Sequence, residues 1–156
     1  MVLIRRMTAD DTMGMHDVHT HAVRQICAQN LKPAVIEAWL HGRTPEGYQR
    51  AADDEGERFW VALNSEDRVV GFAGWRGDEL TALYVLPECH GRGIGSELFQ
   101  ACEEDARNHG CQIVRLDTTL NAVRFYEQFG FHQLREGYRE KRGQRIPHME
   151  MERGLI

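Results

Sequence analysis

A glycine-rich loop near the middle of the chain constrains the fold more than any other segment. Gly91-Arg92-Gly93-Ile94-Gly95 directly follows an apolar run that ends at Pro87 and precedes an amphipathic stretch. In a strand–loop–helix unit of this kind, glycines let backbone amides approach an anion, and the first helical turn adds unpaired N–H groups and the positive end of the dipole. Such a loop also forms where only a turn is needed. The pattern therefore predicts an α/β unit and a candidate phosphate site.

Three short apolar runs precede this loop and predict strands at Arg58–Asn64, Arg68–Trp75 and Glu79–Leu86. The connections are Ser65-Glu66-Asp67 and Arg76-Gly77-Asp78, which are short and rich in turn residues. Connections of this length join antiparallel neighbours, whereas parallel neighbours need a long crossover. We therefore expect an antiparallel meander that delivers its last strand into the glycine loop.

The first third of the chain predicts one strand followed by helices. Val2 to Arg6 is the strand. An amphipathic helix is expected from about residue 10 to 29, where apolar residues recur at helical spacing. Pro33 and Pro45 suit the first turns of two further helices, the second ending at Leu40 and the third near Asp53.

After the loop, helical and extended patterns alternate. We expect a helix that Gly110 ends, a strand at Ile113–Asp117, a short helix at Asn121–Phe129, and strands at Phe131–Tyr138 and Ile146–Glu152. In condensed form, the predicted order is β-αα-βββ-α-β-α-ββ. This is an α/β fold with a mixed central sheet of about six to seven strands and flanking helices. With 156 residues and no linker-like stretch, residues 1–156 are expected to form a single domain.

Composition excludes several classes of protein. The formal net charge of −5 argues against nucleic acid or an anionic membrane as partner. No apolar run approaches the ~20 residues of a membrane span, and charge at Arg5 comes too early for a secretion signal. Without C-x-x-C or zinc-like spacing, free thiols in a reducing compartment are expected at Cys27, Cys89, Cys102 and Cys111. We therefore expect a soluble, cytoplasmic protein.

A dinucleotide site is a poor interpretation of the loop. The dinucleotide fingerprint is G-x-G-x-x-G, but Ser96 stands where the third glycine is needed. Asp117 could imitate the acid that binds the ribose, yet only 39 residues follow it, too few for the rest of a doubly wound sheet.

The loop resembles a known cofactor site. The stretch from Leu83 to Leu98 is similar to the acetyl-CoA loop of the GNAT superfamily of acyl-CoA-dependent N-acetyltransferases. That loop is usually written R/Q-x-x-G-x-G/A, and His90-Gly91-Arg92-Gly93-Ile94-Gly95 fits it except at the first position. There His90 retains a hydrogen-bond donor but lacks the permanent charge of Arg.

A second block strengthens the resemblance. Residues 121–131, Asn-Ala-Val-Arg-Phe-Tyr-Glu-Gln-Phe-Gly-Phe, resemble the family's N-x-x-A/V-x-x-F-Y-x-x-x-G-F element. The two blocks stand in the family's order with a strand between them, while residues 1–57 match by pattern only. The resemblance implies the GNAT fold and an enzyme that transfers an acetyl group from acetyl-CoA directly to an amine. It implies no covalent enzyme intermediate and no metal.

The resemblance also implies catalytic residues. Acetyl transfer requires a neutral amine, a polarised thioester carbonyl and protonation of the leaving thiolate. Tyr126 matches the tyrosine that acts as general acid, although a core aromatic would also fit there. Glu79 lies eleven residues before His90, similar to the general base of histone-acetylating members, although it could equally be an exposed carboxylate beside Asp78. Asn121 is expected to be a helix N-cap and, by resemblance, to contact the pantetheine or a catalytic water.

The resemblance also implies which residues bind the cofactor. In the family, the strand before the loop separates from its neighbour, and its exposed backbone groups pair with the pantetheine arm. The carbonyl of Leu83 and the amides around Val85 are the matching positions. A bulge amide there would polarise the thioester carbonyl. The expected acetyl-CoA contacts are Leu83, Val85, His90, Gly91, Arg92, Gly93, Ile94, Gly95, Ser96, Asn121 and Tyr126.

The acceptor is expected to be a small-molecule amine. In the family, its pocket is built from the first helices and the last strands, which here offer His16, His19, His21, Trp39, Tyr48, Asp53, Asp54, Glu55, Tyr138 and His148. The histidines lack a third ligand at metal spacing and are expected to be solvated or pocket-lining. The negative net charge is compatible with a cationic acceptor. Acylation of a protein amine, a non-catalytic acyl-CoA sensor and a homodimer remain open.

Overall fold

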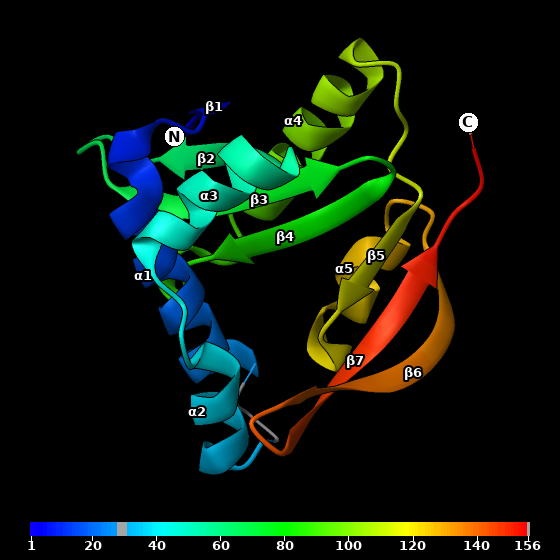
Figure 1. Ribbon diagram of the computed structural model, residues 1–156. Coiled ribbons are helices and arrows are strands. Elements are labelled where there is room, and N and C mark those ends of the chain that lie inside the picture. Colours follow the sequence, from blue (N-terminus) through cyan, green and yellow to red (C-terminus); the bar gives the residue numbers. More distant parts are fainter. Residues whose placement is uncertain (28–30, 156) are drawn as a thin grey trace.

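The computed structural model describes residues 1–27 and 31–155, in which seven strands form one mixed sheet (Figure 1). The strand order across the sheet is β1-β2-β3-β4-β5-β7-β6. The strands are β1 Leu3–Arg6, β2 Arg58–Leu63, β3 Val69–Arg76, β4 Glu79–Val85, β5 Arg115–Thr118, β6 His132–Lys141 and β7 Gln144–Glu152. Only the β4–β5 pair is parallel among these. The predicted α/β class with a mixed sheet is confirmed.

The predicted meander is also confirmed. β2, β3 and β4 pair antiparallel in sequence order, and β1 adds to the outer edge of β2. The β3–β4 register shifts once, where Gly74 faces Ala82 and Trp75 faces Leu80. Thr81 is therefore the extra residue of a bulge in β4. The family resemblance implied a bulge near Val85, but Val85 pairs regularly with Gly71 of β3.

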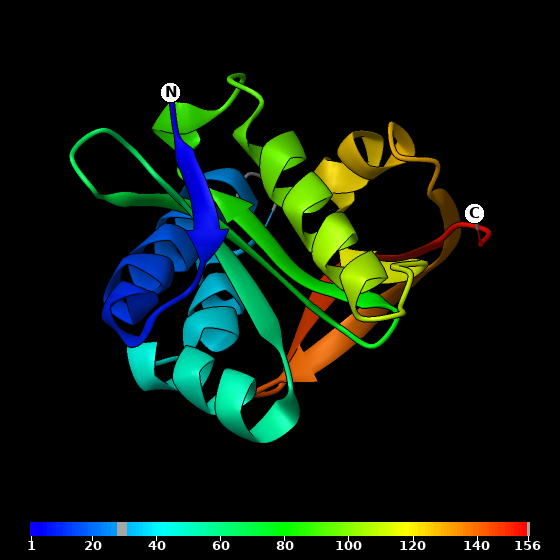
Figure 2. The same cartoon turned by 90° about the horizontal axis from the view of Figure 1, so that it is seen from above.

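In the described part of the chain, five α-helices flank the sheet, with α1 and α3 on one face and α4 on the other (Figure 2). They are α1 Thr12–Ala22, α2 Pro33–Leu40, α3 Pro45–Glu55, α4 Ile94–Asn108 and α5 Val123–Glu127. α1 contacts β3 and β4 and packs on α3, α4 contacts β2, β3 and β4, and α2 packs against β7. Pro33 and Pro45 both start helices as predicted, so three helices precede β2 and the condensed order counted one too few.

Two predicted helices are shorter in the structure. α1 starts at Thr12 and gives way to a π-helical segment at Val23–Cys27, and positions 28 and 29 of the predicted helix lie outside the described residues. α5 has only five residues because a 3₁₀ turn at Leu120–Ala122 precedes it. Its N-cap is Ala122, so the predicted capping role of Asn121 is wrong.

The last two strands extend beyond their predicted ends. β6 continues to Lys141 and β7 starts at Gln144, with Arg142 and Gly143 at the turn in left-handed backbone conformations. The sequence did not predict the extension of β6 past Tyr138, because the residues there are polar and an exposed edge strand does not alternate apolar and polar residues. The hairpin projects past the sheet to the level of α2 (Figure 1).

β4 and β5 separate soon after they start, and this separation positions the site. Their ladder joins only Glu79 to Arg115 and Leu80 to Leu116. Beyond Leu80 the two strands diverge, which agrees with the separation implied by the resemblance. A main core under α1 and α4 includes Met15, Phe72, Leu98 and Phe99, and a smaller one joins α2 to β7 through Val23, Val35, Ile36, Trp39 and Ile146.

Two sequence expectations about the compartment can be compared with the structure. Cys89, Cys102 and Cys111 carry free thiols, whereas the Cys27 side chain is not among those described. Within the described part of the chain, no helix is long and apolar enough to cross a membrane.

Candidate active site

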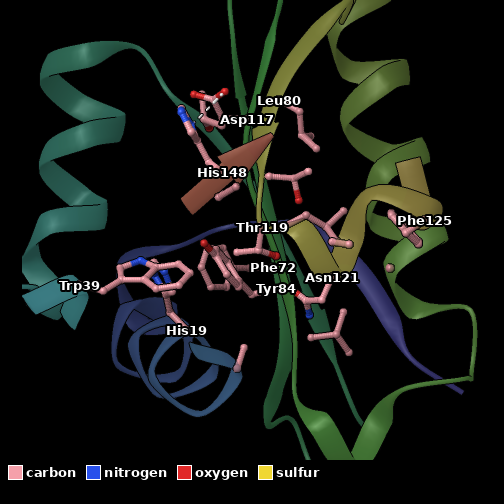
Figure 3. Close-up of a pocket in the computed structure, with 18 of the residues that line it drawn as sticks. His19, Trp39, Phe72, Leu80, Tyr84, Asp117, Thr119, Asn121, Phe125 and His148 are labelled. Atoms are coloured by element: carbon pink, nitrogen blue, oxygen red, sulfur yellow. Dashed lines mark ion pairs between the residues drawn. The ribbon is translucent and has the colours of Figure 1, made fainter. Parts of the chain in front are cut away.

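A cavity of about 1050 Å³ opens where β4 and β5 diverge (Figure 3). One wall comes from α1, the α2–α3 connection and α3, and the floor from β3 and β4. The opposite wall comes from the glycine loop and the segment between β5 and α5. The β6–β7 hairpin lines the cavity on the side of α2, where Lys141 contacts Trp39. The cavity therefore draws on almost every part of the fold, and both sequence blocks open into it.

The glycine loop forms one end of the cavity. Gly91 and Gly93 have φ angles of +79° and +77°, which favour glycine, and nothing lies within 4 Å of the Cβ that another residue would add. Gly93 is the N-cap of α4, so the N–H groups of the first turn of α4 face this end. His90 Nε2 lies 3.2 Å from the carbonyl oxygen of Val85, which ties the loop to β4.

Most of the expected cofactor residues line this cavity. They are Leu83, Val85, His90, Gly91, Gly93, Ile94, Gly95, Ser96, Asn121 and Tyr126. Arg92 is the exception, because its side chain is exposed and outside the lining. Gly95 makes room for a neighbour, since a Cβ there would lie 3.3 Å from the Phe125 ring of α5.

Tyr126 lies deep in the wall. Its side chain is 5% exposed, and its ring packs edge-on against Phe125 and Phe131. Burial, with the nearby Tyr84 and Cys102, raises the pKa of the Tyr126 phenol. The hydroxyl therefore keeps its proton throughout the neutral range and can donate it. Asn121 and Thr119 line the same wall from the segment before α5 (Figure 3).

Two carboxylates near the start of β4 have different surroundings. Glu79 lies outside the cavity lining, with its Oε1 3.6 Å from Arg115. Glu57, just before β2, does line the cavity and accepts a hydrogen bond of 2.9 Å from the hydroxyl of Thr81. Burial raises the pKa of Glu57 and outweighs the hydrogen bond from Thr81 and the charge of Arg76, which lower it; the negative charges of Glu55 and Glu79 add to the rise. Sequence reasoning missed Glu57, which stands in no motif.

Asp117 and His148 face each other across β5 and β7 (Figure 3). Asp117 accepts a hydrogen bond of 2.6 Å from Arg139, and its other oxygen lies 3.5 Å from Nδ1 of His148. That Nδ1 is buried and has no hydrogen-bond partner. Gly137 makes room for the imidazole, because a Cβ there would lie 2.6 Å from His148 Nε2.

The wall opposite the loop is aromatic and positively charged. His19 of α1 is 4% exposed, stacks on Tyr84 at 4.1 Å between ring centroids, and shares a 2.9 Å hydrogen bond between Nδ1 and the Tyr48 hydroxyl. Arg43 Nη1 lies 3.4 Å from the same Nδ1. Lys141 of the β6–β7 hairpin donates a hydrogen bond of 2.9 Å to the carbonyl oxygen of Trp39.

The expected acceptor residues divide into two groups. His19, Trp39, Tyr48 and His148 line the cavity. His16, His21, Asp53, Asp54, Glu55 and Tyr138 do not. Among the residues that the structure describes, no group of three or more His, Cys, Asp or Glu side chains is placed to hold a metal ion.

Comparison with known proteins decides the family. The profile of the acetyltransferase (GNAT) domain matches residues 26–153. The chain belongs to the GNAT acetyltransferase family. An L-methionine sulfoximine/L-methionine sulfone acetyltransferase of Pseudomonas paraeruginosa is 31% identical over 117 residues, which cover 71% of this chain and 67% of that protein.

Other GNAT relatives match over shorter stretches. An aminoalkylphosphonate N-acetyltransferase of Salmonella typhimurium is 41% identical over 71 residues, or 44% of this chain and 41% of that protein. A peptidyl-lysine N-acetyltransferase of the same organism is 33% identical over 72 residues. The match to these two relatives thus spans less than half of their length.

Solved GNAT structures share the whole architecture. A GCN5-related N-acetyltransferase structure from Rhodopseudomonas palustris superimposes with a TM-score of 0.81 at 24% identity, covering 98% of this chain and 95% of that one. The PaiA N-acetyltransferase of Thermoplasma acidophilum, solved with coenzyme A, gives a TM-score of 0.73 at 20% identity and 99% coverage of both chains. At these identities, the likeness establishes the fold.

Proposed function

We propose that this GNAT protein is an N-acetyltransferase that transfers the acetyl group of acetyl-CoA directly to the amine of a small molecule. The observation that carries the proposal is the single cavity at the β4–β5 divergence, which the glycine loop and Tyr126 both line. Two relatives named for amine substrates of low molecular weight, an aminoalkylphosphonate and a methionine derivative, support a small-molecule acceptor.

The chain's own residues fit acetyl-CoA. Beyond Leu80, β4 has no ladder partner on its β5 side, so the backbone near Leu83 and Val85 is available to pair with an extended pantetheine arm. The open space around Gly91 and Gly93 and the first turn of α4 suit the pyrophosphate. When bound, acetyl-CoA supplies the activated thioester.

Tyr126 is proposed as the general acid. Protonating the leaving thiolate avoids releasing a charged sulfur into an enclosed cavity. The raised pKa of Tyr126 keeps the phenol protonated at neutral pH, so its proton is present when negative charge develops on the sulfur. Asn121, on the same wall, is proposed to position the pantetheine or a water molecule, in place of the capping role that the fold excludes.

Glu57 is proposed as the general base, directly or through a water molecule. An alkylammonium has a pKa near 10, so the amine must lose a proton before it attacks the thioester. A carboxylate with a raised pKa is a stronger base than one with the ordinary pKa. Glu57 is half-buried, has a raised pKa, and lines the cavity without an ion-pair partner among the described residues. Glu79 remains the sequence-based prediction, but its pairing with Arg115 outside the lining favours Glu57.

A thiol-release assay tests the proposed reaction. Purified protein is incubated with acetyl-CoA and a panel of small amines, amino acids and lysine peptides, and free CoA is measured as the acetylated product is identified by mass. We expect turnover with at least one small amine. Acetyl-CoA binding without turnover of any amine would instead favour an acyl-CoA sensor, and turnover of lysine peptides alone would favour a protein acetyltransferase.

Replacing each carboxylate separately tests the base. Glu57→Gln is expected to lower kcat/KM by about a hundredfold, within the usual range for loss of a general base. Glu79→Gln is the matched control, because it removes the neighbouring carboxylate that lies outside the lining. If Glu79→Gln caused the larger loss, the assignment of Glu57 would be wrong.

A further inference from the structure

We propose that the acceptor of this transferase carries an anionic group beside its amine, and that Arg43 and Lys141 bind that anion. This inference rests on the proposed function and names the class of its substrate: small amines that also bear a carboxylate, phosphonate or similar acid.

Both cations lack an acidic partner. Arg43, between α2 and α3, and Lys141, at the end of β6, line the same wall of the cavity. No carboxylate among the described residues forms an ion pair with either of them. Even Glu140, which lines the cavity next to Lys141, is not paired with either cation. By contrast, Arg139 on the same strand is neutralised by Asp117.

The charged groups that act on Lys141 and His19 are all positive. Burial lowers the pKa of Lys141, and the nearby Arg43 lowers it further. Burial also lowers the pKa of His19, and every charged group acting on it, namely Arg43, His16 and Lys141, works in the same direction. An ammonium that burial and the nearby Arg43 guanidinium both disfavour gains stability from an anion that lies between the two cations.

His19 provides an independent sign that a ligand belongs here. Its imidazole is 4% exposed and lines the cavity, and its Nδ1 is engaged with the Tyr48 hydroxyl. Its Nε2 is buried and has no hydrogen-bond partner among the residues that the structure describes. Buried polar atoms in folded proteins nearly always have a partner, so an unpartnered nitrogen in a cavity wall marks a place where a polar ligand atom fits.

The wall connects the cations to the proposed acyl-transfer point. Arg43 approaches His19, His19 stacks on Tyr84, and Tyr84 lies close enough to Tyr126 to raise the pKa of its phenol. His19, Tyr84 and Trp39 lie together on this side of the cavity in Figure 3. An acceptor held by its acid at Arg43 would thus lie along these rings with its amine directed toward Tyr126.

Lys141 also has a structural role, which must be distinguished from its proposed role in binding the anion. It donates to the carbonyl of Trp39 in the last turn of α2, where a cation stabilises the helix dipole. That contact uses one of three ammonium protons and leaves the others available. A purely structural lysine would affect stability but not the choice between charged and neutral acceptors, so acceptor discrimination is the decisive readout.

Matched acceptors test the inference. Wild-type protein is assayed with 3-aminopropylphosphonate against 3-amino-1-propanol, and with L-methionine against L-methioninamide, at equal concentrations of neutral amine. We expect kcat/KM to be at least about tenfold higher for the acidic member of at least one pair, as expected for a charge-assisted contact. Equal or better use of the neutral members in both pairs would overturn the proposal.

Variants locate the contact. Arg43→Gln and Lys141→Met are expected to raise KM about tenfold or more for the acidic acceptor while changing kcat/KM for the neutral one by less than about twofold. Arg142→Gln is the matched control, because Arg142 follows Lys141 but contacts His41 outside the lining. Equal losses for both acceptors, or the same selective loss in Arg142→Gln, would contradict a specific anion site.

A binding experiment separates this inference from the proposed reaction. Calorimetry with 3-aminopropylphosphonate, in the presence of CoA, requires no turnover. Binding by wild type that Arg43→Gln weakens supports the anion site even if no acetyl transfer occurs. Turnover of neutral amines, combined with no phosphonate binding, would overturn the anion site and leave the transferase proposal standing.

Discussion

Two polar regions on opposite faces of the sheet are built on different rules. On the α4 face, the buried Asp105 carboxylate accepts hydrogen bonds from Arg58, Trp60 and Trp75 at 2.8–3.1 Å. On the α1 and α3 face, the cavity wall leaves His19 Nε2 and His148 Nδ1 without a hydrogen-bond partner among the described residues, although Asp117 lies 3.5 Å from the latter. Protein groups therefore satisfy the charge of Asp105, whereas the cavity wall keeps polar atoms available to a ligand.

The difference indicates what each region contributes. A satisfied buried network stabilises the fold, because losing one member leaves the others desolvated and unpaired. Polar atoms without hydrogen-bond partners in a cavity wall contribute little to stability, and they are available to bind a ligand. Substitutions in the first region should therefore change unfolding, and substitutions in the second should change catalysis.

The largest expected effect is on stability. Asp105→Asn leaves buried donors of Arg58 and two tryptophans without a carboxylate, and should lower the free energy of unfolding by about 3–5 kcal/mol. Chemical denaturation measures this. Asp53→Asn is the control, because Asp53 is exposed and bonded to Gln49, and should change stability by less than about 0.5 kcal/mol. Similar effects of the two variants would contradict the comparison.

The next effect is catalytic. Tyr126→Phe removes only a hydroxyl from the cavity wall and should lower kcat by about a hundredfold, as loss of a general acid does. Because the ring contacts with Phe125 and Phe131 remain, the melting temperature should change little. Steady-state kinetics from pH 6 to 9 provides the check. An unchanged kcat across that range would remove Tyr126 as the acid.

Acid titration provides a third comparison. Burial opposes the charge of Asp105, but hydrogen bonds from Arg58, Trp60 and Trp75 outweigh it and lower its pKa to about 2 from the ordinary 3.8. Since the folded pKa lies below the unfolded one, its contribution is complete above about pH 5 and disappears as the pH falls toward 2. The contribution amounts to about 2 kcal/mol. Unfolding measured from pH 5 to 2 should show a weaker pH dependence in Asp105→Asn, and an identical slope would contradict this.

The smallest effect probes the cavity geometry. In Gly137→Ala, the new Cβ would lie 2.6 Å from His148 Nε2, so the imidazole must move. We expect a loss of roughly threefold to tenfold in kcat/KM, as small misplacements near a reacting centre cause. The melting temperature should stay within about 2 °C, because the position is on an exposed edge strand. A stability loss without a kinetic change would assign His148 to the framework instead.

The site residues that the sequence predicted lie in contiguous motifs, whereas those it missed are brought together from distant parts of the chain. Gly93 and Tyr126 stand in contiguous blocks whose local spacing carries their geometry, and both line the cavity. Arg43 and Lys141 reach one wall through a loop and a hairpin that are far apart in sequence. Glu57 contacts β4 through a hydrogen bond from Thr81, the bulged residue of that strand. Local sequence periodicity does not predict which distant segments come together, so it could not predict these positions.

The net charge of the chain says little about the acceptor for a related reason. The formal charge of −5 is compatible with a cationic acceptor, but a total cannot say which charges face a cavity. Acidic residues such as Asp53 and Asp54 lie outside the lining, while unpaired Arg43 and Lys141 lie within it. The local arrangement therefore favours an acceptor with an acid of its own.

Calorimetric titration of acetyl-CoA into the wild-type protein tests the central claim most directly. If the cavity at the β4–β5 divergence is a cofactor site, one molecule should bind per chain with a dissociation constant of roughly 1 µM to 1 mM, the usual range of enzyme substrate affinities. The absence of any binding heat over that range, with folded protein, would contradict the cofactor site and the transferase proposal that depends on it.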